Sequence, residues 1–531
     1  MRVNEGEENY SSLPLSLLLS LYLLLSPILK KYHPFDHVFD ENKTGRSVMS
    51  SKVHKELLFL YKSALNSVTG RKVLPNFLQI TSDGVLRVAP SPAFCSNPIV
   101  QEYDLKSRRL VVVGAGKSVL GLTEGFLEFV DAHNINQRNV VSVGKGILSL
   151  PFGINVPSKC LFEKYNVELL FGAKHNIPDE DSVKATKMIV ELIESLNNAD
   201  QKYLVVNFIS GGGSALLALP KVGITLKRKR EIIEKLVKAG STIEELNKVR
   251  RVLSDVKGGK LLRKIANFRN VEMVTFIASD IIGDPIELIA SGPTVPVIGD
   301  AVVQAMEVIN KRGLKLSKEE EEVIFRDEGN QNNQTKPSNF IVVSNVTALS
   351  EVTKLASSKL GYEVVFLGNK IEGEAKDVAV NLANYVRNYK SPSGKKLLFL
   401  GGGETTVTFN DDDSNPGTGG RCQEMALAFF TESFSWSENV TFMAVGSDGQ
   451  DGPTPVAGVI TNSGGLSLIT RDEDASKLLA NCSEGLKYHD SHNFWKKHDP
   501  TCFIDTGGPT GVNVMDLYFF VKESGSHSSR L

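Results

Sequence analysis

From Lys52 onward, short runs of β-branched and aliphatic residues alternate with glycine-rich turns and helical periods. Within each run the apolar residues are continuous, which is typical of strands buried on both faces of a parallel sheet. This pattern predicts an α/β fold built on parallel sheets. The strands expected are 109–115, 202–210, 271–279, 339–345, 396–402 and 440–446.

A polar stretch divides these strands into two groups. Residues 316–339 are rich in Glu, Asn and Gln and contain too little apolar surface for a core, so they predict a surface linker. Further upstream, Ser241 and Glu244 have the spacing of a capping box, which predicts that a helix begins there. The expected organisation is an N-terminal extension (1–51), a first α/β domain (52–296), a connecting segment and linker (297–338), a second α/β domain (339–522) and a polar tail (523–531).

The N-terminal extension contains an apolar run, Leu13–Leu29, slightly shorter than the roughly 20 residues of a membrane span. Acidic residues precede the run, unlike a secretory or mitochondrial leader, and Lys30 and Lys31 follow it. Either the run is an anchor that leaves the rest of the chain facing the cytosol, or Met49 is a usable start. We favour the second interpretation and a cytoplasmic protein, with mitochondrial and membrane-anchored residence as alternatives. Membrane contact is expected only if Leu13–Leu29 is retained.

Composition excludes several classes of partner. The 60 basic and 61 acidic residues give a net charge of −1, so no overall field would attract nucleic acid. The five cysteines are scattered and include no Cys-x-x-Cys pair, which argues against a zinc or redox site and fits a reducing compartment.

The first candidate site follows the strand 109–115, in the sequence VVVGAGKS. Val111 stands where the P-loop pattern needs a glycine, and Val119 replaces the third glycine of the dinucleotide fingerprint. An apolar strand, a turn with Gly114 and Gly116, and a lysine at the start of a helix nevertheless remain. Lys117 is therefore expected to face an anion.

Two further strands of the first group end in polar sequences. After the strand 202–210, Ser210, Gly211, Gly212, Gly213 and Ser214 can form a nest of backbone N–H groups that binds an anion. After the strand 271–279, Asp280 and Asp284 suit Mg²⁺ or a base for a hydroxyl group, although either carboxylate also suits helix capping.

The second group of strands has similar endings. Glu404 follows a triple glycine, and Arg421 begins an amphipathic helix, where its guanidinium suits either a phosphate group or a neighbouring carboxylate. Asp448 and Asp451 suit a hydrated Mg²⁺ or a simple turn. A last glycine-rich loop contains Thr510 and Asn513, to which chemistry alone assigns no role. Both are nevertheless candidates for binding substrate or phosphate, as are Gly114, Gly116 and Glu404.

These features together favour phosphoryl transfer, because anion nests, cations and carboxylates all collect at strand ends. His175 is the histidine nearest such a loop, and a lone loop histidine is more often solvated.

The motifs also resemble those of a known family, the class II glycerate kinases (glycerate 2-kinases), whose C-terminal part is the MOFRL domain. The similar segments are GAGKS, GAKHNIPDEDS, FISGGGSALL, ELNKVRRVLSDVKGGKL, SDIIGDPIELIASGPT, GGGETTVT, GTGGRCQEMAL, GSDGQDGPT and DTGGPTGVNVMDL. They occur in this order across roughly residues 52–522. Cys422 departs from the polar residue that we expect after the arginine.

The resemblance implies two Rossmann-like parallel-sheet domains that enclose an active-site cleft. It also implies phosphorylation of D-glycerate by ATP with Mg²⁺ as cofactor, giving 2-phosphoglycerate, with Lys117 and Arg421 as catalytic residues. Asp280 is our candidate for contacting the glycerate hydroxyl or Mg²⁺, and Asp284, Asp448 and Asp451 are lesser metal candidates. Residue types alone fix neither the hydroxyl that is phosphorylated nor the oligomeric state, and a homodimer is left open.

Two other functions are weighed against this one. Two Rossmann-like domains also suit an NAD(P)-dependent hydroxypyruvate reductase, although the incomplete glycine fingerprint and the lack of a well-placed acidic partner disfavour it. A catalytically inactive binding protein, tethered by Leu13–Leu29, is disfavoured because no strand end has lost its polar residues.

Overall fold

The computed structural model describes residues 52–90, 100–136, 141–197, 200–326, 336–391, 393–409, 417–464 and 474–523. All of them belong to one compact unit, Met49–Leu531. The expectations for Leu13–Leu29, for a start at Met49 and for the tail beyond residue 523 lie outside the described residues. Within the described part, no helix combines the length and the apolar character that a membrane crossing requires.

The first large sheet is parallel throughout, with the strand order β6-β5-β4-β7-β8-β9. The chain moves outward from β4 in one direction and then from β7 in the other, so β4 and β7 mark a switch point. Ligands of open α/β sheets bind outside the carboxyl ends of the strands at such a point. The strands are β4 (Arg108–Ala115), β5 (Val143–Pro151), β6 (Val167–Gly172), β7 (Lys202–Ser210), β8 (Val271–Ala278) and β9 (Asn339–Val343).

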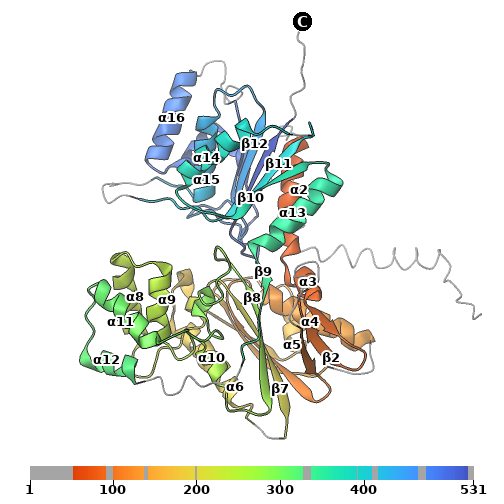
Figure 1. Cartoon of the computed structure of the whole chain (residues 1–531), viewed down its shortest axis with the longest axis vertical. Coiled ribbons are helices and arrows are strands. Elements are labelled where there is room, and N and C mark those ends of the chain that lie inside the picture. Colours follow the sequence, from red (N-terminus) through yellow and green to blue (C-terminus); the bar gives the residue numbers. More distant parts are fainter. Residues whose placement is uncertain are drawn as a thin grey trace, which may run out of the picture. The chain divides into compact units, whose positions relative to one another are not determined.

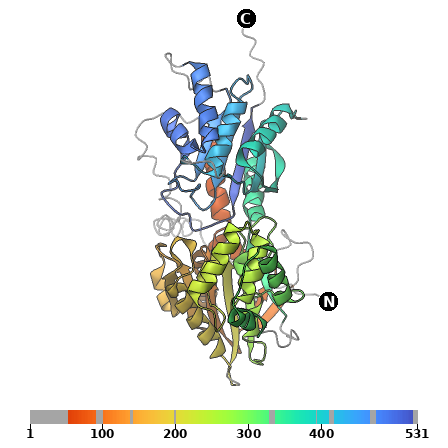
Figure 2. The ribbon, with the colours of Figure 1, turned by 90° about the vertical axis from the view of Figure 1, so that its left-hand side faces the viewer.

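Helices cover both faces of this sheet (Figures 1 and 2). On one face, Phe126 of α4 (Val119–Asn136) packs edge-on against Phe208, which stacks on Phe276 of the neighbouring strand. On the other face, the alternate strand residues pack against α6 and α10 in one apolar cluster. The remaining helices of this part are α5 (Lys159–Lys164), α6 (Glu180–Glu194), α7 (Gly213–Leu216), α8 (Leu226–Lys238), α9 (Ile243–Val252), α10 (Lys260–Arg263), α11 (Ala301–Lys311) and α12 (Lys318–Phe325).

Two boundaries differ from the expectation. The strand β9, assigned from sequence to the second domain, is the edge strand of the first sheet and pairs with β8. The polar stretch expected as a linker begins with α12, which buries Val323 and Ile324 in a cluster shared with α8, α9 and α11. These two apolar residues are enough to anchor a helix whose other faces are charged. The average composition of the stretch, which is highly polar, did not indicate this helix.

The start of α9 also lies one residue later than predicted. Thr242, not Ser241, is the N-cap, and it forms a capping box with Glu245. Both pairs match the sequence pattern, but this register directs Leu246 and Val249 into the apolar cluster beneath the helix.

The sequence assigned residues from 52 onward to the first domain, but the first helix of that range packs against the second sheet's part of the chain. The helix α2 (Lys52–Ser67) packs against α13, and the Tyr61 hydroxyl donates to the Gly446 carbonyl at 2.7 Å, so α2 contacts the part of the chain expected to form the second domain. A small antiparallel sheet, which was not predicted, follows the short helix α3 (Gly70–Val73). It contains β1 (Leu78–Ile80), β2 (Val85–Val88) and β3 (Gln101–Asp104).

The second large sheet is mixed, with the order β10-β11-β15-β12-β13-β14. The expected parallel pairing holds for β10 and β11, whereas β15 lies antiparallel between β11 and β12. Because β11 and β12 therefore point the same way, their carboxyl ends meet the beginning of β15 at one edge. The strands are β10 (Glu363–Ile371), β11 (Leu397–Gly403), β12 (Val440–Gly446), β13 (Gly458–Asn462), β14 (Phe503–Ile504) and β15 (Asp516–Lys522).

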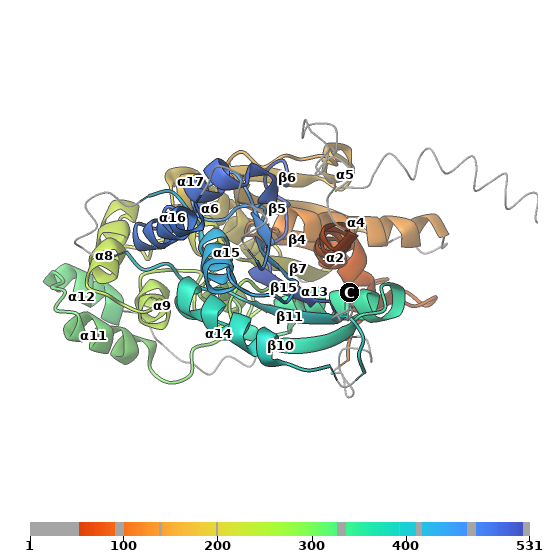
Figure 3. The ribbon, with the colours of Figure 1, turned by 90° about the horizontal axis from the view of Figure 1, so that it is seen from above.

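Helices cover both faces of the second sheet as well. Figure 3 labels α14, α15 and α16 on one side of β11 and β15, with α13 and α2 on the other. An aromatic core that includes Phe399, Phe429, Phe442 and Phe520 lies under α15. The helices are α13 (Asn345–Lys359), α14 (Ala375–Asn388), α15 (Arg421–Glu432), α16 (Ala475–Lys487) and α17 (Ser491–His498). The α/β class predicted from sequence is confirmed for both parts.

Candidate active site

Lys117 lies in the turn between β4 and α4, at the switch point of the first sheet. Its backbone N–H donates to the Gly211 carbonyl at 2.8 Å, and the Ser118 N–H donates to Ser210 Oγ at 3.0 Å. A methyl group on Gly116 would lie 2.1 Å from that same Ser210 Oγ, so only glycine allows the two turns to approach so closely. Lys117 is exposed, and its side chain lies beside Gly212 of the next turn.

Gly114, expected to bind substrate, instead lies inside the fold. A methyl group there would be 2.7 Å from Val119 Cγ1 and 2.8 Å from the Phe208 carbonyl oxygen. Its role is to allow α4 to pack closely on the sheet, because Val119 fills the space beside it.

Each glycine of the Ser210–Ser214 turn faces a different neighbour. A methyl group on Gly211 would lie 1.6 Å from Asp280 Oδ2, and one on Gly212 would lie 2.9 Å from Lys117 Cγ. The same position on Gly213 lies 2.7 Å from Ala290 Cβ. The turn therefore brings its backbone, Lys117 and Asp280 together, as expected from the order of the strands. Ser210 secures the Lys117 turn, and Ser214 Oγ lies 3.1 Å from Ser291 Oγ.

Asp280 follows β8 and lies beside this glycine turn. The pKa of its carboxyl is raised from the ordinary value of 3.8 to about 6, chiefly by burial and also by Asp448, although the charge of Lys117 acts to lower it. Asn513 Nδ2 donates to Asp280 Oδ2 at 3.3 Å. Two residues predicted from separate parts of the chain are thus in contact.

Arg421 is the first residue of α15 and forms two ion pairs. Its Nε and Nη2 donate to Asp516 Oδ2 and Oδ1 at 2.5 and 2.9 Å, and its Nη1 lies 3.1 Å from Glu404 Oε1. Burial lowers the pKa of the guanidinium, but Asp516 outweighs that effect and the pKa is raised overall. The arginine is therefore held in one orientation by two carboxylates.

Sequence reasoning missed Asp516. It considered residues that follow strands, whereas Asp516 begins β15, directly opposite Gly403 of β11 and Gly446 of β12. The available signal was a single carboxylate in front of the apolar run LYFFV. Such a residue lies at the site edge only if its strand runs antiparallel to its neighbours.

Asp448 is a carboxylate on which the charges of both cations act. Burial raises the pKa of its carboxyl, the Gln450 N–H lowers it, and the charges of both Lys117 and Arg421 lower it as well. Lys117 and Arg421, more than 300 positions apart in the sequence, therefore act on one carboxylate.

The other metal candidates have different surroundings. Both carboxylate oxygens of the buried Asp451 accept hydrogen bonds at the start of α15, from the N–H groups of Cys422 and Gln423 at 3.0 and 2.9 Å and from Gln423 Nε2 at 2.9 Å. Asp284 lies in a left-handed turn with φ of 57°. In the part of the chain that the structure describes, no group of three or more His, Cys, Asp or Glu side chains is arranged to hold a metal ion.

Two last predicted residues stabilise loops. Thr510 Oγ1 donates to the Ser447 carbonyl at 2.6 Å, and its backbone N–H donates to the Asp448 carbonyl at 3.1 Å. Asn513 Oδ1 accepts from the Met515 N–H at 3.1 Å. Thr510 thereby positions the loop of Asp448, and Asn513 reaches Asp280 with its amide nitrogen.

A polar residue that was not predicted also lies at the glycine turn. Asn176 Oδ1 is 3.4 Å from the position that a methyl group on Gly212 would occupy. Asn176 and its neighbour His175 both adopt positive φ angles, 59° and 55°, a region in which Asn and His are enriched among non-glycine residues. The loop after β6 therefore brings Asn176 to the glycine turn, on the side where Lys117 lies.

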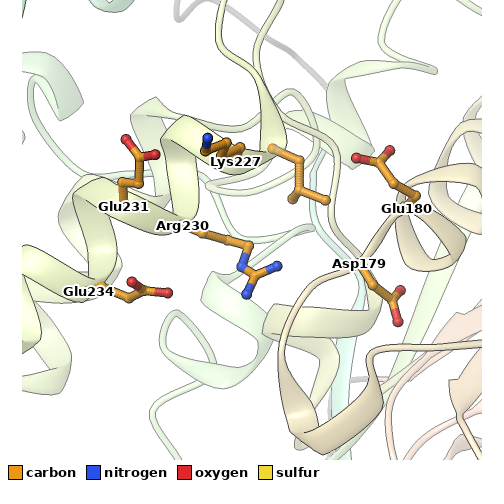
Figure 4. A pocket seen from close by; sticks show the side chains of 7 residues that line it. Asp179, Glu180, Lys227, Arg230, Glu231 and Glu234 are labelled. Atoms are coloured by element: carbon orange, nitrogen blue, oxygen red, sulfur yellow. The ribbon is translucent and has the colours of Figure 1, made fainter.

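A separate hollow lies between α8 and the beginning of α6 (Figure 4). Lys227 and Arg230 share it with the carboxylates of Asp179, Glu180, Glu231 and Glu234. Because acidic groups outnumber basic ones, this hollow does not suit a polyanion such as ATP, and no predicted site residue lines it.

Comparison with known proteins identifies the relatives of this chain. Residues 56–324 match a family model described as a domain of unknown function (DUF4147), and residues 397–516 match the MOFRL family model. A glycerate kinase from Bos taurus is 30% identical over 526 residues, covering 90% of this chain and 94% of the relative. The chain belongs to the glycerate kinase family.

Other members of the glycerate kinase family extend the comparison. A D-glycerate 2-kinase from Thermotoga maritima is 29% identical over 413 residues, covering 77% of this chain and 89% of that protein. The crystal structure of a Thermotoga maritima glycerate kinase superposes with a TM-score of 0.66 at 26% identity, covering 88% of this chain and 99% of that one. The resemblance seen in the sequence is thus confirmed along most of the chain.

Proposed function

We propose that this protein transfers the γ-phosphoryl group of ATP to the 2-hydroxyl group of D-glycerate. The observation that carries the proposal is that Lys117 and Arg421, from the two halves of the chain, act on the same carboxylate, Asp448. Family membership supports the kinase activity, and the name of the Thermotoga maritima relative supports the 2-position.

In this proposal the two cations stabilise the charge of the group in transfer. Lys117 is exposed beside the glycine turn, and Arg421 is oriented by Asp516 and Glu404. Preorganised positive groups at a reacting phosphoryl group are worth about 10²–10³ in turnover each. The N–H groups of Gly211–Ser214 bind phosphate oxygens or the glycerate carboxylate.

Asp280 accepts the proton of the attacking hydroxyl group. With a pKa of about 6, its carboxylate is mostly ionised at neutral pH and is a stronger base than an ordinary aspartate. As the hydroxyl oxygen forms its bond to phosphorus, the proton passes to Asp280 and the bond to the ADP oxygen breaks. The products are ADP and 2-phosphoglycerate.

Mg²⁺ is proposed as the cofactor that enters with ATP, and Asp448 is the residue suited to hold it. Mg²⁺ commonly binds proteins through one or two carboxylates and keeps several water ligands. Asp448 fits because burial raises its pKa and a single N–H group, that of Gln450, bonds to the carboxylate. Asp451 does not fit, since its oxygens already accept three hydrogen bonds. The ion would neutralise phosphate charge close to the acidic groups of the site.

The test is an ADP-coupled assay with D-glycerate and MgATP, followed by phosphorus NMR of the product. We expect ADP release that depends on D-glycerate and a product phosphorylated at carbon 2. Lys117→Met and Arg421→Met should each lower kcat by about 10²-fold or more. Reduction of hydroxypyruvate by NAD(P)H without ATP would instead establish the reductase, and near-normal turnover by Lys117→Met would refute the assigned roles.

A further inference from the structure

Four basic side chains lie close together where α8, α9 and α10 meet, and the mechanism above uses none of them. We call Lys229, Arg250, Lys257 and Lys260 the α8–α10 basic cluster. The charges of Arg250 and Lys260 act on Lys229, and those of Lys229 and Arg250 act on Lys257. The three lysines are only 5, 1 and 7% exposed, which is rare for lysine.

Two of these lysines have clear structural partners. Lys257 Nζ donates to the Ala290 carbonyl at 3.1 Å, and Lys260 Nζ donates to the Arg251 and Ser254 carbonyls at 3.3 and 3.0 Å. Both lysines are thus bonded to backbone carbonyls, near the end of α9 and in the turn before α11.

The other two members have no such partner among the described residues. The buried Lys229 Nζ makes no hydrogen bond with any of them. For Arg250, burial lowers the pKa of the guanidinium, and no acidic neighbour in the described part offsets that effect. Asp255 supplies an acidic charge that acts on Lys229, against the positive charges of Arg250 and Lys260. A buried ammonium without a partner, such as that of Lys229, is costly, and native proteins rarely retain one.

The protonation of Lys229 reflects the same imbalance. Burial, together with the charges of Arg250 and Lys260, lowers its pKa to about 7, although Asp255 acts in the opposite direction. An anion placed next to the ammonium would reverse these effects and restore its charge.

We propose that Lys229 and Arg250, backed by Lys257, bind an oxyanion group, the carboxylate or phosphate of a small organic acid. This anion site is distinct from Lys117 and Arg421. An oxyanion there supplies the acceptors that the Lys229 ammonium and the Arg250 guanidinium lack among the described residues.

Contacts link this anion site to the glycine turn of the candidate active site. Lys257 holds the carbonyl of Ala290, whose Cβ lies 2.7 Å from the position that a methyl group on Gly213 would occupy. The adjacent Ser291 donates to Asn247 Oδ1 of α9 at 2.7 Å and lies 3.1 Å from Ser214 Oγ. A bound oxyanion would therefore fix the loop that supports the glycine turn. That the oxyanion belongs to glycerate or its phosphate ester rests on the proposed function, whereas the anion site itself does not.

The experiment is isothermal titration calorimetry on the full chain carrying Lys117→Met, which weakens binding at the glycine turn. The probes are inorganic phosphate and D-glycerate, titrated separately. Adding Lys229→Met or Arg250→Gln should weaken binding about tenfold or more, because each change removes a charged hydrogen bond to the anion. The matched control is Lys227→Met, because Lys227 is an exposed residue of α8 that lines the separate hollow (Figure 4), so its loss should leave binding unchanged.

A second readout separates binding from support of the fold. Lys229→Met removes an unpaired buried charge, so the unfolding temperature without ligand should stay the same or rise while anion affinity falls.

The two probes identify the group that binds. If only phosphate binding is weakened by these changes, the site takes a phosphate group, and if only D-glycerate binding is weakened, the site takes a carboxylate. Unchanged affinity for both probes in Lys229→Met and Arg250→Gln, or no binding by the parent chain, would overturn the proposal. Should Lys229→Met fail to fold, the half-buried Arg250 still provides the test. Because calorimetry measures binding and not turnover, a failed kinase assay would leave the test of this anion site unaffected.

Discussion

Asp516 holds Arg421 through two parallel hydrogen bonds, from the first residue of the central strand β15 to the first residue of α15. Such a pair fixes both the position and the plane of the guanidinium. The carboxylate is fully buried, so its partner determines whether it is stable there.

The first prediction concerns this pair. Asp516→Asn should lower kcat at least tenfold and reduce the free energy of unfolding by about 2–3 kcal/mol, because one charged hydrogen bond is lost and Arg421 gains freedom. Coupled-assay kinetics and urea denaturation measure the two effects. Asp505→Asn, an exposed change in a nearby loop, is the control. An Asp516→Asn enzyme with full activity would show that the orientation of Arg421 does not matter.

The second prediction concerns the pH dependence of Asp280. Its folded-state pKa of about 6 exceeds the ordinary 3.8, so ionisation destabilises the fold. Relative to Asp280→Asn, the native protein should therefore gain about 2 kcal/mol as the pH falls from 7 to 4, and lose it again as the pH rises through 6. Denaturation curves of both proteins across this range measure the difference. In kinetics, kcat/KM should rise with pH through an apparent pKa near 6, since the base must be ionised. A constant stability difference would contradict the raised pKa.

The third prediction uses the closest approach in the site. Gly211→Ala would place a methyl carbon 1.6 Å from Asp280 Oδ2, so either the turn or the carboxylate must move. Turnover should fall about 10²-fold or more, as expected when a reacting group is displaced by about 1 Å. Gly121→Ala is the matched control, because a methyl group added at this helical position would have no neighbouring atom within 4 Å, and alanine favours helix. Equal activities of the two variants would argue against the role of Asp280.

The fourth prediction separates the two aspartates of the loop after β12. Asp448→Asn should raise the Mg²⁺ concentration needed for half-maximal activity several-fold. Asp451→Asn should leave that concentration unchanged and cost about 1–2 kcal/mol of stability, because its carboxylate caps α15. Activity measured against Mg²⁺, together with thermal unfolding, distinguishes them. The reverse pattern would make Asp451 the metal ligand.

The sequence predicted those parts of the fold that depend on local pattern. Buried parallel strands have continuous apolar runs and glycine turns, so the pattern alone was enough to place Lys117, the Ser210–Ser214 turn and Asp280 at one edge of a sheet. Pairing between distant segments leaves no such pattern. The insertion of β15 between β11 and β12 was therefore missed, and Asp516 with it. Likewise, nothing near Asp451 in the sequence indicates that α15, about 30 positions earlier, needs a cap.

The central place of β15 has a consequence for how the protein is made. Within the sheet that the structure describes, strands β11 and β12 are joined only through β15, which begins 70 residues after β12 ends. The second sheet must stay open on the ribosome until residue 522 has emerged, and Arg421 has no Asp516 until then. A nascent chain would thus expose two unpaired strand edges while its first sheet is already complete, which makes this interval the one in which chaperones would matter most.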